Sequence, residues 1–461
     1  MRGFLDKQNI VLGAGAAGLA AAWELAEKKK NVRVLERNAI VGGMISYVEK
    51  NGNKYEYGSH VFHTDNEELR VRVLELMKDR FFSFDRGGKI SICFRGKYYR
   101  YPLNGIDILV NFPLGLSAEC VWDFVVSFLS NKLFYKEPRN SAEVLRSHFG
   151  KKLYEVFFKD YTHKFWGRPC EELDKLFALE RIPRSDVVKV VKDVCDALGI
   201  GGKFAEHNLT ERAIGKLYYS KNGIHDLADR MANKIRENNG VIDTDVTLAR
   251  INIEGGRAAT IEYTKGGERL SAGVENIVST IPLRYLIPLF NPLPPREVLD
   301  CAERLQHLPF TVCGLLVNKP SVRDAVCTYY RDCVFNRLSE PTAHGLTTIP
   351  ENKTILLAEM TDFTLREDGL NTDADILKRV VDDIISLGLI KREEVEDSCV
   401  FRYREAYPIY HIGFQDDLKV IFDYLKSLQN VFTTGRQGLF RYVNTHATMQ
   451  LAIEEVGSIP A

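Results

Sequence analysis

The segment that most constrains the fold is an apolar stretch that runs into a turn with three glycines. The apolar residues are 10–12, after Asn9, and the glycines are Gly13, Gly15 and Gly18. Gly13 permits a tight turn, Gly15 leaves room for a pyrophosphate to approach the backbone, and Gly18 lets the next helix pack closely on the strand. The spacing therefore predicts a strand, a phosphate-binding turn and a helix over residues 19–26.

An acidic residue and a second pair of glycines extend this motif. Glu36 closes the next apolar run, residues 32–35, at the distance of about 20 residues where a carboxylate can accept hydrogen bonds from a ribose. Gly42 and Gly43 follow after a short polar stretch. Nicotinamide dehydrogenases do not usually need this glycine pair, so its presence bears on which dinucleotide is bound. The alternative is that the two glycines only form an ordinary turn. The pattern predicts a nucleotide cofactor whose phosphates face a helix N-terminus.

The combined pattern resembles a flavoprotein superfamily that includes amine oxidases, protoporphyrinogen oxidases and UDP-galactopyranose mutases. In that superfamily the glycine triplet, the glutamate and the glycine pair form the FAD signature, so the resemblance implies bound FAD. Because one fold hosts oxidases, desaturases and isomerases, the signature identifies the cofactor and not the reaction. The cofactor contacts implied by the signature and its neighbours come from Gly13, Gly15, Ala16, Ala17, Gly18, Glu36, Arg37, Gly42, Gly43 and Met44.

A first narrower segment, residues 57–66, resembles the histidine loop of the mutases, which lines the flavin ring. The resemblance implies catalytic roles for His60 and His63. A metal site on these two histidines is the alternative, but no third ligand lies at a telling spacing, and we expect no metal. The cofactor contacts that the loop implies come from Tyr57, Gly58, Ser59 and His60.

A second segment covers residues 161–167 and 181–184. Its resemblance to the mutases implies that Tyr161 and Trp166 hold the base region of a nucleotide and a mobile loop, and that Arg181 binds the diphosphate in a catalytic role. Two phosphate charges suit a guanidinium fork, and a base suits an aromatic platform. The alternative is that the tryptophan packs in the core and the arginine is solvated.

Two further segments, residues 329–337 and residues 404–409 with 435–444, resemble the mutases' substrate sheet and closing motif. The first match is looser, and Arg337 could instead be a charge on a sheet surface. Asn444 and Phe440 replace a common aspartate and a frequent tyrosine, but asparagine can still bond a ribityl hydroxyl. The implied contacts are Arg337, Tyr407 and Tyr442 to substrate; Gly435, Arg436, Tyr442 and Asn444 to FAD; and a catalytic role for Arg436.

The order of elements predicts an α/β protein with three parts. These are a doubly wound, FAD-binding Rossmann-like domain, an inserted helical domain with a mobile loop, and an antiparallel-sheet substrate domain. The FAD-binding domain would be discontinuous. The expected boundaries are 1–105, 216–290 and 425–461 for the FAD-binding domain, 106–215 for the helical insert and 291–424 for the substrate domain.

Local signals support this division. Short strands over residues 90–94 and 97–101 are expected to end the first stretch of the FAD-binding domain. Strands over residues 311–317, 354–360 and 398–403 are expected to form the antiparallel sheet of the substrate domain. In the helical insert, Ser141 and Ser185 are typical of helix N-caps and Gly150 of a break. The resemblance further implies that Val246 lies against the adenine end of FAD.

The resemblance as a whole implies a FAD-dependent nucleotide-sugar mutase that interconverts pyranose and furanose forms, with reduced flavin N5 as the nucleophile. NAD(P)H is a candidate external reductant, and cell-surface polysaccharide biosynthesis is the expected setting. The nearest rival is an FAD-dependent oxidase or desaturase of the amine oxidase or protoporphyrinogen oxidase type. A flavin-binding scaffold or sensor without turnover is a third class. The sequence leaves open the sugar and the oligomeric state, for which a homodimer is one candidate.

Composition limits location and partners. Lysine plus arginine equals aspartate plus glutamate at 62 each, so no global basic field would recruit nucleic acid. Nine cysteines occur without a CxxC pair, which predicts a reducing compartment, and together with the lack of a signal-peptide pattern we expect a cytoplasmic protein. Charges and a proline interrupt the apolar stretch 108–134, so we expect core packing there, or contact with a membrane surface, rather than a spanning helix.

Overall fold

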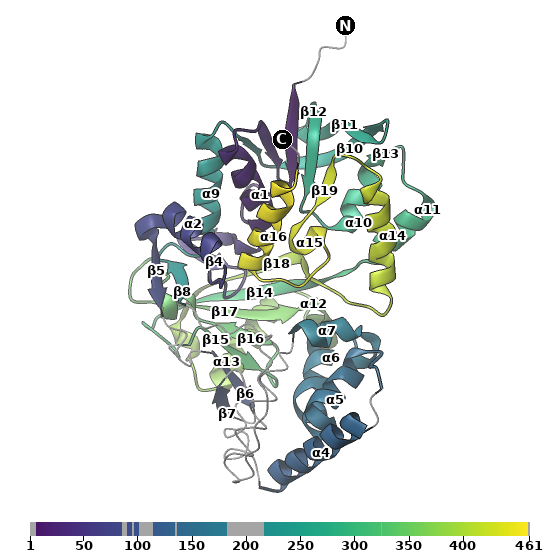
Figure 1. Ribbon diagram of the computed structural model, residues 1–461. Helices are drawn as coiled ribbons and strands as arrows, with labels where there is room; N and C mark the ends of the chain where they lie inside the picture. Colours follow the sequence, from purple (N-terminus) through teal and green to yellow (C-terminus); the bar gives the residue numbers. More distant parts are fainter. Residues whose placement is uncertain are drawn as a thin grey trace.

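Two large sheets, with helices around them, form the body of the protein in the computed structural model (Figure 1). One sheet contains the predicted cofactor strand, and the other lies below it in the view of Figure 1. A group of helices extends to the lower right of the second sheet. The structure describes residues 6–84, 90–94, 96–100, 114–133, 136–181, 216–323 and 325–459.

The first sheet has the strand order β13-β10-β11-β12-β1-β2-β9, and β19 pairs with β12. Strand β1 pairs in parallel with both β2 and β12, so the carboxyl ends of these strands meet at one edge. This is the edge at which α/β sheets bind nucleotides. The bounds are β1 (Lys7–Leu12), β2 (Val32–Leu35), β9 (Val241–Asp243), β10 (Val246–Glu254), β11 (Arg257–Lys265), β12 (Glu268–Ser279), β13 (Phe290–Asn291) and β19 (Val431–Thr433).

Helix α1 (Ala16–Glu27) follows β1 directly and contains the predicted helix 19–26. A Cβ on Gly18 would lie 1.8 Å from the Gly13 carbonyl oxygen, so only glycine lets the helix lie this close to the turn. Helices α9 (His225–Glu237) and α16 (Thr445–Gly457) pack beside α1. Helices from distant parts of the chain therefore lie beside α1, the helix that follows the predicted cofactor turn (Figure 1).

The second sheet has the order β18-β14-β17-β16-β15-β6-β7. Neighbouring strands are antiparallel except for β15 and β6. The strands expected at 311–317, 354–360 and 398–403 lie within β14, β17 and β18, which are adjacent at one end of this order. The bounds are β6 (Ile90–Phe94), β7 (Lys97–Arg100), β14 (His307–Val317), β15 (Cys327–Tyr330), β16 (Arg337–Ser339), β17 (Thr354–Thr361) and β18 (Val395–Pro408).

The structure differs from the sequence-based expectation in where some segments pack. Strands β6 and β7, expected in the FAD-binding part, extend the second sheet by pairing with β15. Helices α11 (Arg296–Arg304) and α14 (Phe414–Lys426), expected within the substrate part, pack on each other, and α14 also packs on β19 of the first sheet. A residue pattern identifies a strand or helix, but its partner is chosen by tertiary packing.

The helical part consists of α4 (Leu114–Leu133), α5 (Ser141–Leu153), a π-helical turn over Tyr154–Lys159, α6 (Asp160–Trp166) and α7 (Lys175–Arg181). The N-cap of α5 is Asn140, whose side chain accepts from the Glu143 N–H, and not Ser141 as expected. The expected break is present at Gly150, which has a φ of +79°. Ser185 and the expected mobile loop lie outside the described residues.

The apolar face of α4 is only partly covered, because Trp122 is 72% exposed. Core packing, which we expected for this stretch, therefore does not apply to this tryptophan.

Over the ranges that the structure describes, no helix combines the length and apolar character needed to cross a membrane. The predicted division into three domains, with its boundaries, remains a prediction.

Candidate functional site

Two glycine-rich loops meet at the carboxyl ends of β1 and β2. The Gly42 N–H donates to the Ala14 carbonyl at 2.7 Å, and Gly15 and Gly42 form an isolated parallel bridge. A Cβ on Gly43 would lie 3.1 Å from the Gly15 Cα, so the loops approach each other only because side chains are absent. The contact fixes the backbone of the turn that is predicted to receive a pyrophosphate.

Glu36 is buried at the end of β2 and is held by the first turn. Its Oε2 accepts from the Ala14 N–H at 2.7 Å, and its Oε1 accepts from both the backbone and side-chain nitrogens of Asn38 at 2.9 Å. The Val246 N–H donates to the Glu36 carbonyl at 2.9 Å. Glu36 and Val246 therefore lie together at the end of the turn where the motif predicts the adenosine part of a dinucleotide.

Residues near the end of the chain close the same site. Gly435 has a φ of +75°, and a Cβ there would lie 2.4 Å from the Ala17 Cβ, so the short helix α15 (Gly435–Gly438) rests directly on the start of α1. Arg37 forms an ion pair of 2.6 Å with Glu405 on β18. The second sheet and the C-terminal segment are thereby attached to the cofactor loops.

The histidine loop places His60 beside two arginines. Burial, together with the charges of Arg337 and Arg436, lowers the pKa of His60 to about 3, so the ring is neutral at pH 7. Its Nε2 is buried and has no hydrogen-bond partner among the described residues. Gly58, with a φ of +121°, lies against Glu359, and a Cβ there would come 3.0 Å from the Glu359 Oε1.

Arg337 is locked to a buried carboxylate rather than exposed on the sheet surface. Its Nε donates to Glu359 Oε1 at 2.8 Å and to Oε2 at 2.9 Å, and its Nη2 donates to Oε2 as well. Ser339 Oγ donates to the same carboxylate at 2.9 Å. Sequence reasoning missed Glu359, although a single carboxylate inside the wholly buried strand β17 was the signal for it.

Aromatic rings and Arg436 form the centre of the predicted substrate region. Tyr407 stacks on Tyr442 with ring centres 5.7 Å apart, and Trp166 meets Tyr407 edge to face at 5.9 Å. The Arg436 guanidinium lies 4.4 Å from the Tyr442 ring centre and 5.0 Å from that of Tyr407. Tyr161 is one ring further away, stacked on Phe165. Trp166 is itself only 5% exposed, so it also packs in the core.

Two predicted residues stand apart from this cluster. The His63 ring lies 4.4 Å from that of His446 at the start of α16, and burial lowers the pKa of His446 to about 4. The side chain of Arg181 lies outside the described residues. The preceding residue, Glu180, accepts from the Tyr410 hydroxyl at 2.9 Å, and this hydroxyl accepts from the Tyr442 N–H at 2.9 Å. The end of α7 is therefore attached to the closing motif.

Orphaned polar atoms test whether a flavin dinucleotide fits this site. Ser279 Oγ and Thr434 Oγ1 are buried at the carboxyl ends of β12 and β19, and Arg436 Nε is buried beside the aromatic rings. None of the three has a hydrogen-bond partner within the described ranges. Buried polar groups are rarely left unpaired, and a ligand with phosphates, hydroxyls and a polar ring would supply partners. No group of three or more metal-ligating side chains is found in the described part of the chain.

Comparison with known proteins shows the family to which this chain belongs. Residues 16–436 match the family of flavin containing amine oxidoreductases. A probable UDP-galactopyranose mutase from Klebsiella pneumoniae is 30% identical over 184 residues, which cover 39% of this chain and 45% of that protein. The match thus spans less than half the length of that relative. The coproporphyrinogen III oxidase of Bacillus subtilis is 21% identical over 93% of both chains.

A solved structure of reduced UDP-galactopyranose mutase has the same fold. It covers 98% of this chain with a TM-score of 0.80 at 18% sequence identity, and 93% of that structure is matched. This likeness confirms the predicted α/β class with a Rossmann-like cofactor domain. The family match implies a flavin cofactor. The chain therefore belongs to the family of flavin containing amine oxidoreductases, the superfamily that its glycine motif predicts, and it is similar to UDP-galactopyranose mutases in part of its sequence and in its fold.

Proposed function

We propose that the protein is a FAD-dependent mutase that interconverts the pyranose and furanose forms of a nucleotide sugar. The observation that carries this proposal is the cluster of Arg436, Tyr407, Tyr442 and Trp166 beside the neutral ring of His60. A guanidinium held between two rings suits a phosphate, and neighbouring rings suit a base or sugar. The similarity to a probable UDP-galactopyranose mutase supports the same class of reaction.

The two glycine loops, Glu36 and Gly435 would hold FAD, whose reduced form supplies a nucleophilic N5. The task of the protein is then to hold the substrate diphosphate and sugar in place. Arg436 is suited to this task because one of its nitrogens, Nη2, donates to the Ala406 carbonyl at 2.8 Å while Nε stays without a partner in the described part of the chain. The first contact fixes the guanidinium plane, and the second donor is left for a ligand.

Arg337 has a different part in this proposal. Its charge is already balanced by Glu359, so Arg337 adds little net positive charge to the site. Its contribution to substrate binding would be hydrogen-bond donors held in a fixed orientation. The two negative charges of a diphosphate would be met chiefly by Arg436 and by Arg181 at the end of α7. The neutral ring of His60 adds a hydrogen-bonding group without a further charge.

An FAD-dependent oxidase is the second candidate, because the coproporphyrinogen III oxidase relative aligns over 93% of both chains. The two functions differ in redox balance. A mutase needs reduced flavin, ends each cycle with it and consumes no oxidant. An oxidase begins with oxidised flavin and yields one hydrogen peroxide or one reduced acceptor per turnover.

The test follows nucleotide sugars by chromatography while peroxide is measured, with and without dithionite or NADPH. UDP-galactopyranose and a panel of other nucleotide sugars are the substrates. We expect conversion to a furanose isomer only after reduction, and no stoichiometric peroxide. Turnover by the oxidised protein with matching peroxide would overturn the mutase proposal in favour of the oxidase.

A further inference from the structure

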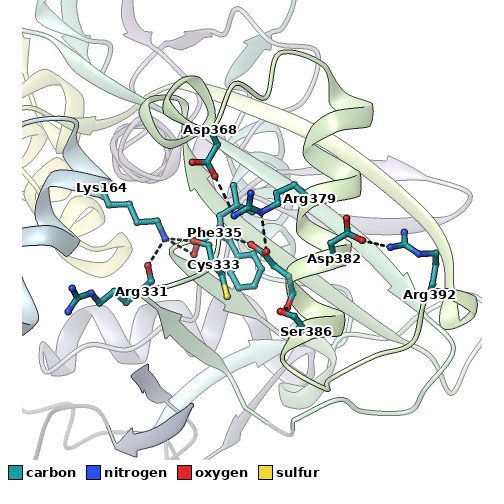
Figure 2. Close-up of polar contacts among 11 residues, drawn as sticks. Lys164, Arg331, Cys333, Phe335, Asp368, Arg379, Asp382, Ser386 and Arg392 are labelled. Carbon is teal, nitrogen blue, oxygen red and sulfur yellow. Dashed lines mark hydrogen bonds and ion pairs between the residues drawn. The ribbon is translucent and has the colours of Figure 1, made fainter. Parts of the chain in front are cut away.

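The side chain of Lys164 extends from α6 into the segment 331–335, which joins β15 to β16 (Figure 2). Its Nζ donates to the carbonyl of Arg331 at 3.1 Å, to that of Phe335 at 3.4 Å, and to that of Cys333. An ammonium has three N–H donors. Each donor thus has its own backbone acceptor in this segment.

The same segment is attached to its surroundings by other bonds. Arg331 Nη1 donates to the Val156 carbonyl and Nη2 to Asp160 Oδ2, both at 2.7 Å. Each of the two parts, the segment 331–335 and the helical part, therefore donates side-chain hydrogen bonds to the other. The Val334 N–H donates to Asp383 Oδ2 on α13 (Asp373–Ser386) at 2.6 Å. The Lys164 carbonyl accepts from Thr364 Oγ1 at 2.9 Å. Lys164 is therefore the centre of a hydrogen-bonded joint between α6 and the second sheet.

Both sides of this joint lead directly to the candidate site. Along α6, Lys164 stands two residues before Trp166 and three after Tyr161. Along the sheet, Phe335 stands two residues before Arg337, which begins β16 and pairs with Glu359. We propose that Lys164 is a positioning residue that sets the place of the α6 aromatic rings relative to Arg337, and thereby the affinity for the nucleotide. The part that concerns the nucleotide rests on the proposed function.

Lys164 can be tested by titration because burial makes its charge sensitive to pH. Burial lowers the pKa of Lys164 to about 8. The nearby Cys333 thiol and the charges of Asp332, Asp368 and Asp383 act in the opposite direction and raise this pKa. Arg379 on α13 forms ion pairs with Asp383 at 3.0 Å and with Asp368 at 3.7 Å (Figure 2). Its positive charge weakens the effect of both carboxylates on the pKa of Lys164. Above pH 8 a neutral amine would offer two donors to three carbonyls. Arginine in its place would keep its charge throughout this range.

The experiment follows Trp166 itself, by fluorine NMR of flavin-loaded protein labelled with 5-fluorotryptophan. The chain has three tryptophans, and Trp166→Phe assigns the relevant signal. In the parent we expect the Trp166 signal to move with a midpoint near pH 8. In Lys164→Arg the movement should disappear, and in Lys164→Met the signal should already be displaced at pH 7 and should not titrate.

UDP titration of the same samples reads the consequence for the ligand. Lys164→Met should weaken UDP binding roughly tenfold, as expected for a displaced contact, and Lys164→Arg less. Lys159→Met is the matched control, since Lys159 is exposed on the preceding turn, and it should leave both readouts unchanged.

The outcomes separate the two proposals. A Trp166 signal that does not titrate in the parent, or that titrates equally in Lys164→Arg, would refute the positioning role even if Lys164→Met fails to fold. If the Trp166 signal responds as expected but the parent binds no UDP or other nucleotide sugar, the joint is supported and the proposed function fails.

Discussion

Replacing Glu56 with glutamine is expected to change how the stability of the protein depends on pH. Glu56 ends strand β4 (Asn53–Glu56), immediately before the histidine loop, and is fully buried. Its Oε2 accepts from the Tyr219 hydroxyl at 2.8 Å and its Oε1 from the Ile224 N–H at 2.6 Å. Burial raises its pKa from 4.5 to about 7, although these two hydrogen bonds act in the opposite direction.

The sign and size of the effect follow from this pKa. Between pH 4.5 and 7 the folded protein binds the Glu56 proton more tightly than the unfolded chain, so the free energy of unfolding falls as pH rises through this window. A displacement of the pKa from 4.5 to about 7 corresponds to ~3 kcal/mol. The stabilisation is complete below pH 4.5 and lost above about pH 7.

Glutamine resembles the protonated carboxyl group. It keeps an oxygen for the Ile224 N–H and places its amide group against the Tyr219 oxygen, but it cannot ionise. Relative to the parent, Glu56→Gln should therefore gain ~3 kcal/mol of stability as the pH is raised from 4.5 to 7.5. Urea unfolding of both proteins, followed by circular dichroism at several pH values, measures this difference. Glu49→Gln, at an exposed position on the neighbouring strand, should show no such trend.

The reasoning would be refuted if the difference between Glu56→Gln and the parent stayed constant across the same pH range. Constancy would mean that Glu56 ionises in the folded protein with its ordinary pKa. A loss of stability in the variant that is the same at every pH would indicate that glutamine disturbs packing. It would also indicate that the folded protein does not raise the pKa of Glu56.

Three other substitutions test separate parts of the structure. Gly18→Ala places a Cβ 1.8 Å from the Gly13 carbonyl oxygen and should cost roughly 2–3 kcal/mol in chemical unfolding; an unchanged midpoint would contradict the close packing of α1. Glu359→Ala leaves the partly buried Arg337 without its buried carboxylate partner and should cost roughly 3 kcal/mol, whereas a near-neutral effect would show that the pair is solvated. Arg181→Ala should weaken UDP binding by roughly 1.5–3 kcal/mol, about tenfold to a hundredfold. Equal affinity for UDP in a calorimetric titration would remove Arg181 from the diphosphate site.

Local features of the fold could be predicted from sequence because neighbouring residues determine them. The turn at Gly13, the helix after it and the strand around residues 311–317 depend on spacing and apolar pattern alone. The pairing of β6 with β15 could not be predicted, because a short apolar strand fits either sheet equally well.

The candidate site shows the same limit. Tyr407 and Tyr442 could be named from motifs, and the structure brings their rings into contact. The contact of His63 with His446 joins distant parts of the chain and carries no local signal. The role of Lys164 could not be predicted from sequence either. Its ammonium group donates to three backbone carbonyls, and every residue has such a carbonyl, so no side-chain pattern marks the acceptors.

The contact between Gly435 and Ala17 has a consequence for how the protein is made. The helix that rests on the cofactor turn is synthesised long after the turn itself, because Gly435 and Ala17 lie far apart in the chain. Domains tend to fold in the order of their synthesis, yet here the cofactor site stays incomplete on one side until the helix that begins at Gly435 has been made. Stable loading of flavin would then be a late event in biogenesis, and chains that stop short of residue 435 would stay colourless.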